Sequence, residues 1–204
     1  MLQLNDPRFD PIIAQYSADM EALAGRAFGG ELEEREYRDE VERLTMAVLL
    51  ALFLLAGGNQ DSQQGQRFMQ EQGRIVKDSS RALAKDLYDG RYSESEEQTA
   101  EEARQKLSNR FDLWTFMPGR VFHYGLILAV TTGGTADARY RWDMDPSKKN
   151  CDDCKGLNGI VLTGAEWNDL GLYPQSYALI CKGWCGCKLT PTDAPSMGLE
   201  NVRV

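Results

Sequence analysis

All five cysteines of this 204-residue chain lie within 37 consecutive positions near its end. Cys151 and Cys154 form a Cys-x-x-Cys pair in "NCDDCKGLNG", and "CKGWCGCKL" follows with Cys181, Cys185 and Cys187. Two sulfurs separated by two residues can both turn toward one metal ion, and a second close pair completes a tetrahedron of thiolates. The spacing therefore predicts one Zn²⁺ per chain, with the ligands Cys151, Cys154, Cys185 and Cys187.

Cys181 has two interpretations in this scheme: it is a spare thiol, or it replaces one of the four ligands. Two other roles for the cysteines stay open, namely disulfides and reduced thiols without a partner. Disulfides require an oxidising compartment, and five cysteines leave one unpaired. The N-terminal sequence "MLQLNDPRFD" has no basic region followed by an apolar run, so a cleaved secretory signal is not expected. A metal is favoured because a region with few apolar residues gains stability from it.

Catalytic patterns are missing from the sequence. A catalytic thiol needs a base within reach, and the only histidine, His123, lies in the apolar segment "GRVFHYGLILAV". There, a core or interface histidine with satisfied hydrogen bonds is the favoured interpretation. The chain has no His-Glu-x-x-His, no Gly-x-Ser-x-Gly and no phosphate-binding loop. We therefore expect no catalytic residues and a protein that is not an enzyme.

The residues that position the cysteines begin with a long helical region. Apolar residues at helical spacing predict helices over about 11–28, 31–56 and 62–88, and a shorter apolar helix over about 120–130. Between them, Ser95 and Gln98 form a possible capping box for a further helix, and Pro118 is expected to interrupt the chain. The apolar stripes of all these helices are expected to form the core.

After residue 138 the pattern changes to short strands. The segment 138–145 alternates apolar and polar residues, 159–164 is a second strand candidate, and "GAEWNDLGLY" predicts one or two helical turns. The predicted fold class is therefore mainly α: an N-terminal helical, bundle-like domain over 1–138 and a small α+β, zinc-stapled, cysteine-rich region over 139–204.

The net charge of −8 lies entirely in residues 1–138, which hold 15 Lys and Arg against 23 Asp and Glu. Nucleic-acid affinity comes largely from cations that neutralise phosphates, so this part is a poor DNA-binding surface. The segment 46–58 offers 11 apolar residues, about half of the ~20 needed to cross a bilayer. We expect it to be the buried half of a helix, and we expect no membrane partner.

The cysteine-rich region resembles the phage head morphogenesis family, the Mu F-like minor head proteins. The similarity lies in "RYRWDMDPSKKNCDDCKGLNGIVLTGAEW" followed by "CKGWCGCKL", about 50 of the 204 residues. The family pattern is a Trp-bearing strand, an Asp, Cys-x-x-Cys, a Leu-x-Gly turn with a short strand, and a late Cys-x-Cys. The matching residues are Trp142, Asp145, Cys151, Cys154, Leu157, Gly159, Val161, Cys185 and Cys187. Members often carry a His before the late Cys-x-Cys, where this chain has Lys182.

The resemblance implies a structural and assembly factor of a phage head, with Zn²⁺ in its C-terminal region. It implies association with the portal or other head proteins and a location in the virion or procapsid, after synthesis in the bacterial host cytoplasm. The alternative is a zinc-ribbon module that binds nucleic acid and carries a helical dimerisation domain; Asp152 and Asp153 oppose it. A third hypothesis, an enzyme or membrane-active protein, would use His123 or the segment 46–58.

Overall fold

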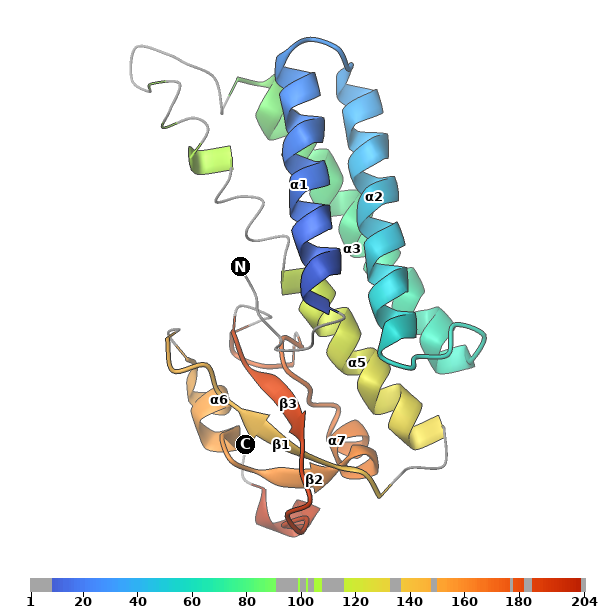
Figure 1. Cartoon of the computed structure of the whole chain (residues 1–204), viewed down its shortest axis with the longest axis vertical. Coiled ribbons are helices and arrows are strands. Elements are labelled where there is room, and N and C mark those ends of the chain that lie inside the picture. The colour runs from blue at the N-terminus through green and yellow to red at the C-terminus, as the bar shows by residue number, and fades with distance from the viewer. Residues whose placement is uncertain are drawn as a thin grey trace.

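The computed structural model describes residues 9–90, 99, 102, 105–107, 116–132, 137–147, 150–176, 178–181 and 185–202. Within these residues the chain is mainly helical, with a small three-stranded antiparallel sheet in the C-terminal region. Figure 1 shows three long helices side by side at one end of the molecule, the sheet at the other end, and α5 (Phe116–Thr132) between them. The predicted mainly helical architecture with an α+β C-terminal region is confirmed.

The three long helices are α1 (Phe9–Phe28), α2 (Glu34–Leu55) and α3 (Gln63–Tyr88). Each begins within three residues of its predicted start, and local capping fixes the starts of α2 and α3. The Ser62 side chain accepts a hydrogen bond from the Gly65 N–H at 3.0 Å and so caps α3. At the start of α2, Glu33 and Glu36 form a reciprocal capping box.

The core of the helical region lies around α2, which packs against α1, α3 and α5. One face of the predicted apolar segment of α2 is buried: Leu49, Leu52 and Phe53 are fully buried between the neighbouring helices, whereas Leu54 is 45 % exposed. Phe28 departs from its predicted core position and is 46 % exposed, because it is the last residue of α1. Among the described helices, none combines the length and hydropathy that a membrane span requires.

The helix predicted after Ser95 falls mostly outside the described residues, as do Ser95 and Gln98 themselves. The capping box that the structure describes lies four residues later. The Thr99 N–H donates to the Glu102 carboxylate at 2.9 Å, and the Glu102 N–H donates to the Thr99 hydroxyl at 3.2 Å. Leu107 is buried in the same cluster as residues of α1 and α3.

Helix α5 begins earlier than the sequence predicts. It starts at Phe116 rather than near Arg120, so Pro118 lies in its first turn. Proline is tolerated there, because the first N–H groups of a helix have no acceptor within the helix. The predicted interruption at Pro118 is therefore wrong.

In the C-terminal sheet, β1 (Arg139–Asp143) lies between β2 (Val161–Thr163) and β3 (Lys188–Pro191). Both neighbours pair with β1 in antiparallel register, and Trp142 lies opposite Leu189. The sequence predicted β1 and β2 but not β3. Two short helices lie between the strands in sequence: α6 (Asp152–Leu157) follows β1, and α7 (Gly164–Leu170) follows β2. A 3₁₀ turn spans Leu199–Asn201.

Helix α5 joins the two parts of the structure. It packs against both α2 and α7, and Ile127 belongs to the same buried cluster as Trp142. The rings of Tyr124 and Tyr173 lie 5.2 Å apart across the same contact. The division into domains at residue 138 stays a prediction, and apolar contacts cross that boundary.

His123 on α5 is buried, as the sequence predicts for a core or interface residue. Neither ring nitrogen has a hydrogen-bond partner among the described residues, so the expected satisfied hydrogen bonds are not found there. Burial, together with the positive charge of Lys188, lowers the pKa of His123 to about 3. The ring is therefore neutral at physiological pH, because both effects disfavour the imidazolium.

The contact between α5 and α2 depends on Gly125. A Cβ at this position would lie 2.8 Å from the Phe53 carbonyl oxygen and 3.1 Å from the Ala56 Cβ. Gly125→Ala is therefore expected to lower the free energy of unfolding by about 1–3 kcal/mol, measured by urea denaturation.

The matched control is Gly25→Ala in α1, where the added Cβ meets no atom within 4 Å. Alanine is favoured over glycine in an exposed helix, so this variant should gain about 0.5–1 kcal/mol. Equal effects of the two substitutions would contradict a close contact between α2 and α5.

Candidate metal centre

The five cysteines meet in one place, at the end of the sheet that faces α6. They form two groups in which all sulfur atoms lie within 4.8 Å of one another: Cys151, Cys154 and Cys181 in one, and Cys154, Cys185 and Cys187 in the other. Cys154 is common to both. The four predicted ligands are therefore distributed over two overlapping groups, and Cys181 joins them.

The first pair is positioned by the start of α6. Cys151 is the N-cap residue, and its sulfur accepts a hydrogen bond from the Cys154 N–H at 3.4 Å. This turn places both side chains on the same side of the chain, with Cys154 fully buried and Cys151 half-buried. The sequence predicted the Cys-x-x-Cys turn but not the helix that it caps.

Cys181 comes from the loop that follows α7. The Ile180 N–H donates to the Asp153 carboxylate at 2.7 Å, which fastens this loop to α6. As a result, the sulfur of Cys181 lies 4.0 Å from that of Cys154. Asp153 therefore has a structural role beside the cysteines that its sequence position did not reveal.

The second pair lies immediately before β3. Cys185 and Cys187 are both buried, and the Cys185 carbonyl accepts a hydrogen bond from the Gln175 side chain at 3.0 Å. Between them, Gly186 faces Asp145, and a Cβ there would lie 2.7 Å from a carboxylate oxygen of Asp145. Because a side chain would collide with Asp145, glycine suits the middle of this Cys-x-Cys turn.

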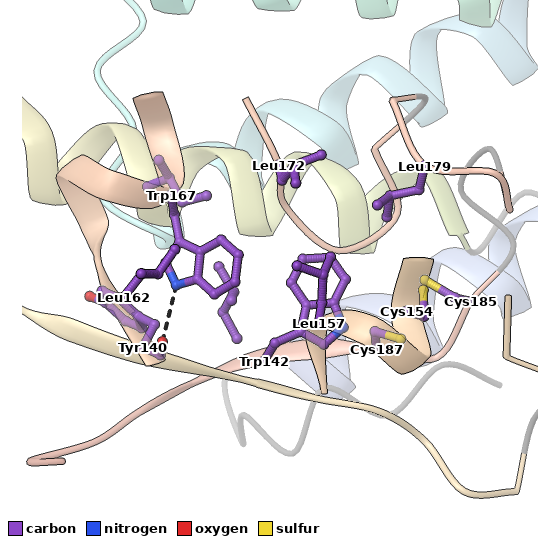
Figure 2. Close-up of a cluster of buried hydrophobic side chains, with 12 residues drawn as sticks. Tyr140, Trp142, Cys154, Leu157, Leu162, Trp167, Leu172, Leu179, Cys185 and Cys187 are labelled. Carbon is purple, nitrogen blue, oxygen red and sulfur yellow. Dashed lines mark hydrogen bonds between the residues drawn. The ribbon is translucent and has the colours of Figure 1, made fainter. Parts of the chain in front are cut away.

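Trp142 packs the cysteines against the remaining core of the region. Its side chain is fully buried, and its ring centroid lies 5.5 Å from that of Trp167. Trp167 in turn donates its indole N–H to the Tyr140 carbonyl at 3.0 Å. Figure 2 shows Trp142 between Trp167 and the three buried cysteines. One apolar cluster therefore includes both the tryptophans and the sulfur atoms.

Backbone N–H groups donate hydrogen bonds to two of the sulfur atoms. Cys151 accepts from the N–H groups of Cys154 and Cys181, and Cys187 accepts from that of Asp145. The Trp142 indole N–H has no regular hydrogen-bond partner among the described residues, but it lies near enough to Cys187 to favour its thiolate. N–H donors of this kind stabilise thiolates and orient them as metal ligands.

The crowded sulfur atoms also change one another's acidity. Hydrogen bonds from Cys154 and Cys185 lower the pKa of Cys187 to about 4. Cys154 hydrogen-bonds to Cys185 and Cys187 and is buried, so its pKa is raised. Although a hydrogen bond from Cys154 favours the Cys185 thiolate, the neighbouring Cys187 and burial raise the pKa of Cys185 overall. Several negative charges cannot share this volume without a cation.

The donor set fits a thiophilic divalent ion. The sulfurs of a tetrahedral zinc site lie ~3.8 Å apart, given a Zn–S distance of about 2.3 Å, and the two groups here are nearly that compact. Thiolates also select Zn²⁺ over the hard cations that prefer oxygen. The clustered cysteines could therefore hold a metal ion.

Other charged groups near the centre pair with one another. Lys155 donates to Asp152 at 2.8 Å within α6, so the cation and one carboxylate beside the first cysteine pair neutralise each other. Of the lysines close to the cysteines in the sequence, Lys148, Lys149 and Lys182 lie outside the described residues.

Comparison with protein-family models, curated proteins and solved structures gives no match. The family resemblance therefore depends on the sequence motifs alone.

Removal of the metal is expected to loosen the C-terminal region and to leave most of the helical structure intact. The cores of α1, α2 and α3 contain no cysteine, whereas the cluster around Trp142 and Trp167 includes three. Chelation should therefore change tryptophan fluorescence and near-ultraviolet circular dichroism, while the far-ultraviolet helical signal changes little.

The matched variants for this measurement are Cys154→Ser and Ser80→Ala. Cys154→Ser should reproduce the effect of the chelator without any chelator present. Ser80→Ala lies in the helical core, away from the sulfur atoms, and should retain the response to chelation. Loss of the whole helical signal on chelation would show that the two parts fold as one unit.

Proposed function

We propose that this chain is a structural and assembly protein of a phage head, and that one Zn²⁺ holds its C-terminal region together. The observation that carries the proposal is the convergence of the Cys-x-x-Cys and Cys-x-Cys turns on one buried cluster beside Trp142. These are the elements of the minor head protein pattern, in the same order along the chain. The proposed role is not enzymatic.

The electrostatic character of the helical region supports a protein partner. Residues 1–138 carry the whole negative excess, and the first half of α2 holds five acidic side chains against three arginines. Arg35 and Arg38 pair with Asp39, and Arg43 pairs with Glu40, so a net negative charge remains after this pairing. Such a surface repels duplex DNA, whereas it can complement a basic protein surface. We therefore propose the portal or another head protein as the partner, with the protein located in the procapsid or virion.

The zinc-ribbon alternative needs unpaired basic and aromatic side chains beside the cysteines. The pairing of Lys155 with Asp152 removes one of the cations that it would use. Asp153 also adds a negative charge beside the first cysteine pair. Nucleic acid therefore remains the less favoured partner, and the following experiment distinguishes the two.

Co-expression with the portal protein encoded in the same genome is expected to give a complex that survives co-purification. Deletion of the gene should reduce the yield of infectious, DNA-filled heads. Cys154→Ser should weaken the complex if the zinc-stapled region takes part in it, and Gly25→Ala should not. Normal heads from the deletion, without portal association, would contradict the proposal. Salt-sensitive binding of DNA by the isolated chain would then favour the zinc-ribbon alternative.

A further inference from the structure

The five cysteines differ in burial: three are fully buried and two are half-buried. Cys154, Cys185 and Cys187 are at most 1 % exposed and form one of the two compact groups. Cys151 and Cys181 are both half-buried. Structural zinc sites are almost always four-coordinate, so the buried three need one more ligand.

Cys151 and Cys181 are equivalent candidates for that fourth position. Each lies within 4.8 Å of Cys154, and the two lie within 4.8 Å of each other. Neither belongs to the compact group of the buried three, so one of them must move toward Cys185 and Cys187 to complete a tetrahedron. The backbone holds both residues in place, so it does not favour either one as the fourth ligand. Cys151 is held by the start of α6, and Cys181 is held by the hydrogen bond from the Ile180 N–H to Asp153.

We infer that Cys151 and Cys181 are interchangeable as the fourth ligand of one ion bound by Cys154, Cys185 and Cys187. The cysteine that is not bound remains as a thiol beside the ion, where it can replace the other. This inference rests on the proposed zinc site and names the ligand exchange within it. A fixed set of ligands, Cys151, Cys154, Cys185 and Cys187, would instead give Cys181 no role in metal binding.

A second arrangement of the same sulfur atoms is two ions that share Cys154. Each ion would then have three sulfur ligands, and each would need a fourth ligand from water or from a side-chain oxygen. Five thiolates can complete one four-sulfur site but not two, so the observations favour a single ion. A stoichiometry of two ions per chain would overturn the inference.

Serine substitutions test the exchange without disturbing the backbone. Serine is a good N-cap residue, so Cys151→Ser preserves the cap of α6. Each full-length variant is titrated with Co²⁺ and Zn²⁺, and its fold is checked by far-ultraviolet circular dichroism. The absorption bands of Co²⁺ distinguish four sulfur ligands from three sulfurs and one oxygen.

Cys151→Ser and Cys181→Ser should each bind one ion with the four-sulfur spectrum and within about tenfold of the wild-type affinity. The double variant should lose the four-sulfur spectrum and at least about a hundredfold in affinity, since even loss of an outer-shell partner costs 10–100-fold. Cys185→Ser, the matched single substitution among the buried three, should lose the four-sulfur spectrum by itself.

Thiol alkylation of the zinc-loaded protein gives an independent measurement. One cysteine per chain should react with N-ethylmaleimide, and peptide mass spectrometry should find the label at both Cys151 and Cys181. In either single variant the remaining four thiols should be protected. Label at Cys181 alone, together with loss of the four-sulfur spectrum in Cys151→Ser, would show a fixed ligand set and overturn the inference. Wild-type protein that binds no metal would instead reject the proposed zinc site, and this inference with it.

Discussion

The C-terminal region depends on the packing of sulfur atoms from three separate segments against the Trp142 side chain. The start of α6, the loop after α7 and the turn before β3 have few apolar residues of their own, and each sends its cysteines into the same cluster. The neighbouring sulfur atoms and burial raise the pKa values of Cys154 and Cys185, and a bound cation would offset the negative charge of their thiolates. The proposed metal would add to the apolar cluster around Trp142 and Trp167, which is the hydrophobic core of this small region.

Helix α5 packs against both the C-terminal region and the helical region and so connects them. It packs on α2 through the close approach at Gly125, and it contributes Ile127 to the cluster that contains Trp142. The acidic helices and the cysteine cluster are therefore held in a defined arrangement by one apolar element. For the assembly role proposed above, such an arrangement would favour binding, because a partner that contacts both parts binds more tightly when their geometry is fixed beforehand.

Much of this architecture follows from sequence patterns with a local cause. The periodic apolar residues of α1, α2 and α3 predicted the helices, and the close spacing of Cys151 with Cys154 predicted that their side chains would meet. Strand β3 was missed because four residues ending in Pro191 carry little strand signal, and non-local contacts stabilise them: the pairing with β1 and the burial of Leu189. The start of α5 was misplaced because Pro118 resembles a helix breaker, although a first-turn proline is compatible with the helix. The place of Cys181 depends on the contact between Ile180 and Asp153, which no local pattern indicates.

Zinc K-edge X-ray absorption would show whether cysteine thiolates bind one Zn²⁺ in the native protein. The protein should be purified without chelators and without metal-affinity resin, so that the metal it acquires in the cell is retained. We predict one zinc per chain, with four sulfur ligands at about 2.3 Å and no nitrogen or oxygen ligand. Protein without zinc, or zinc surrounded mainly by nitrogen and oxygen, would contradict it.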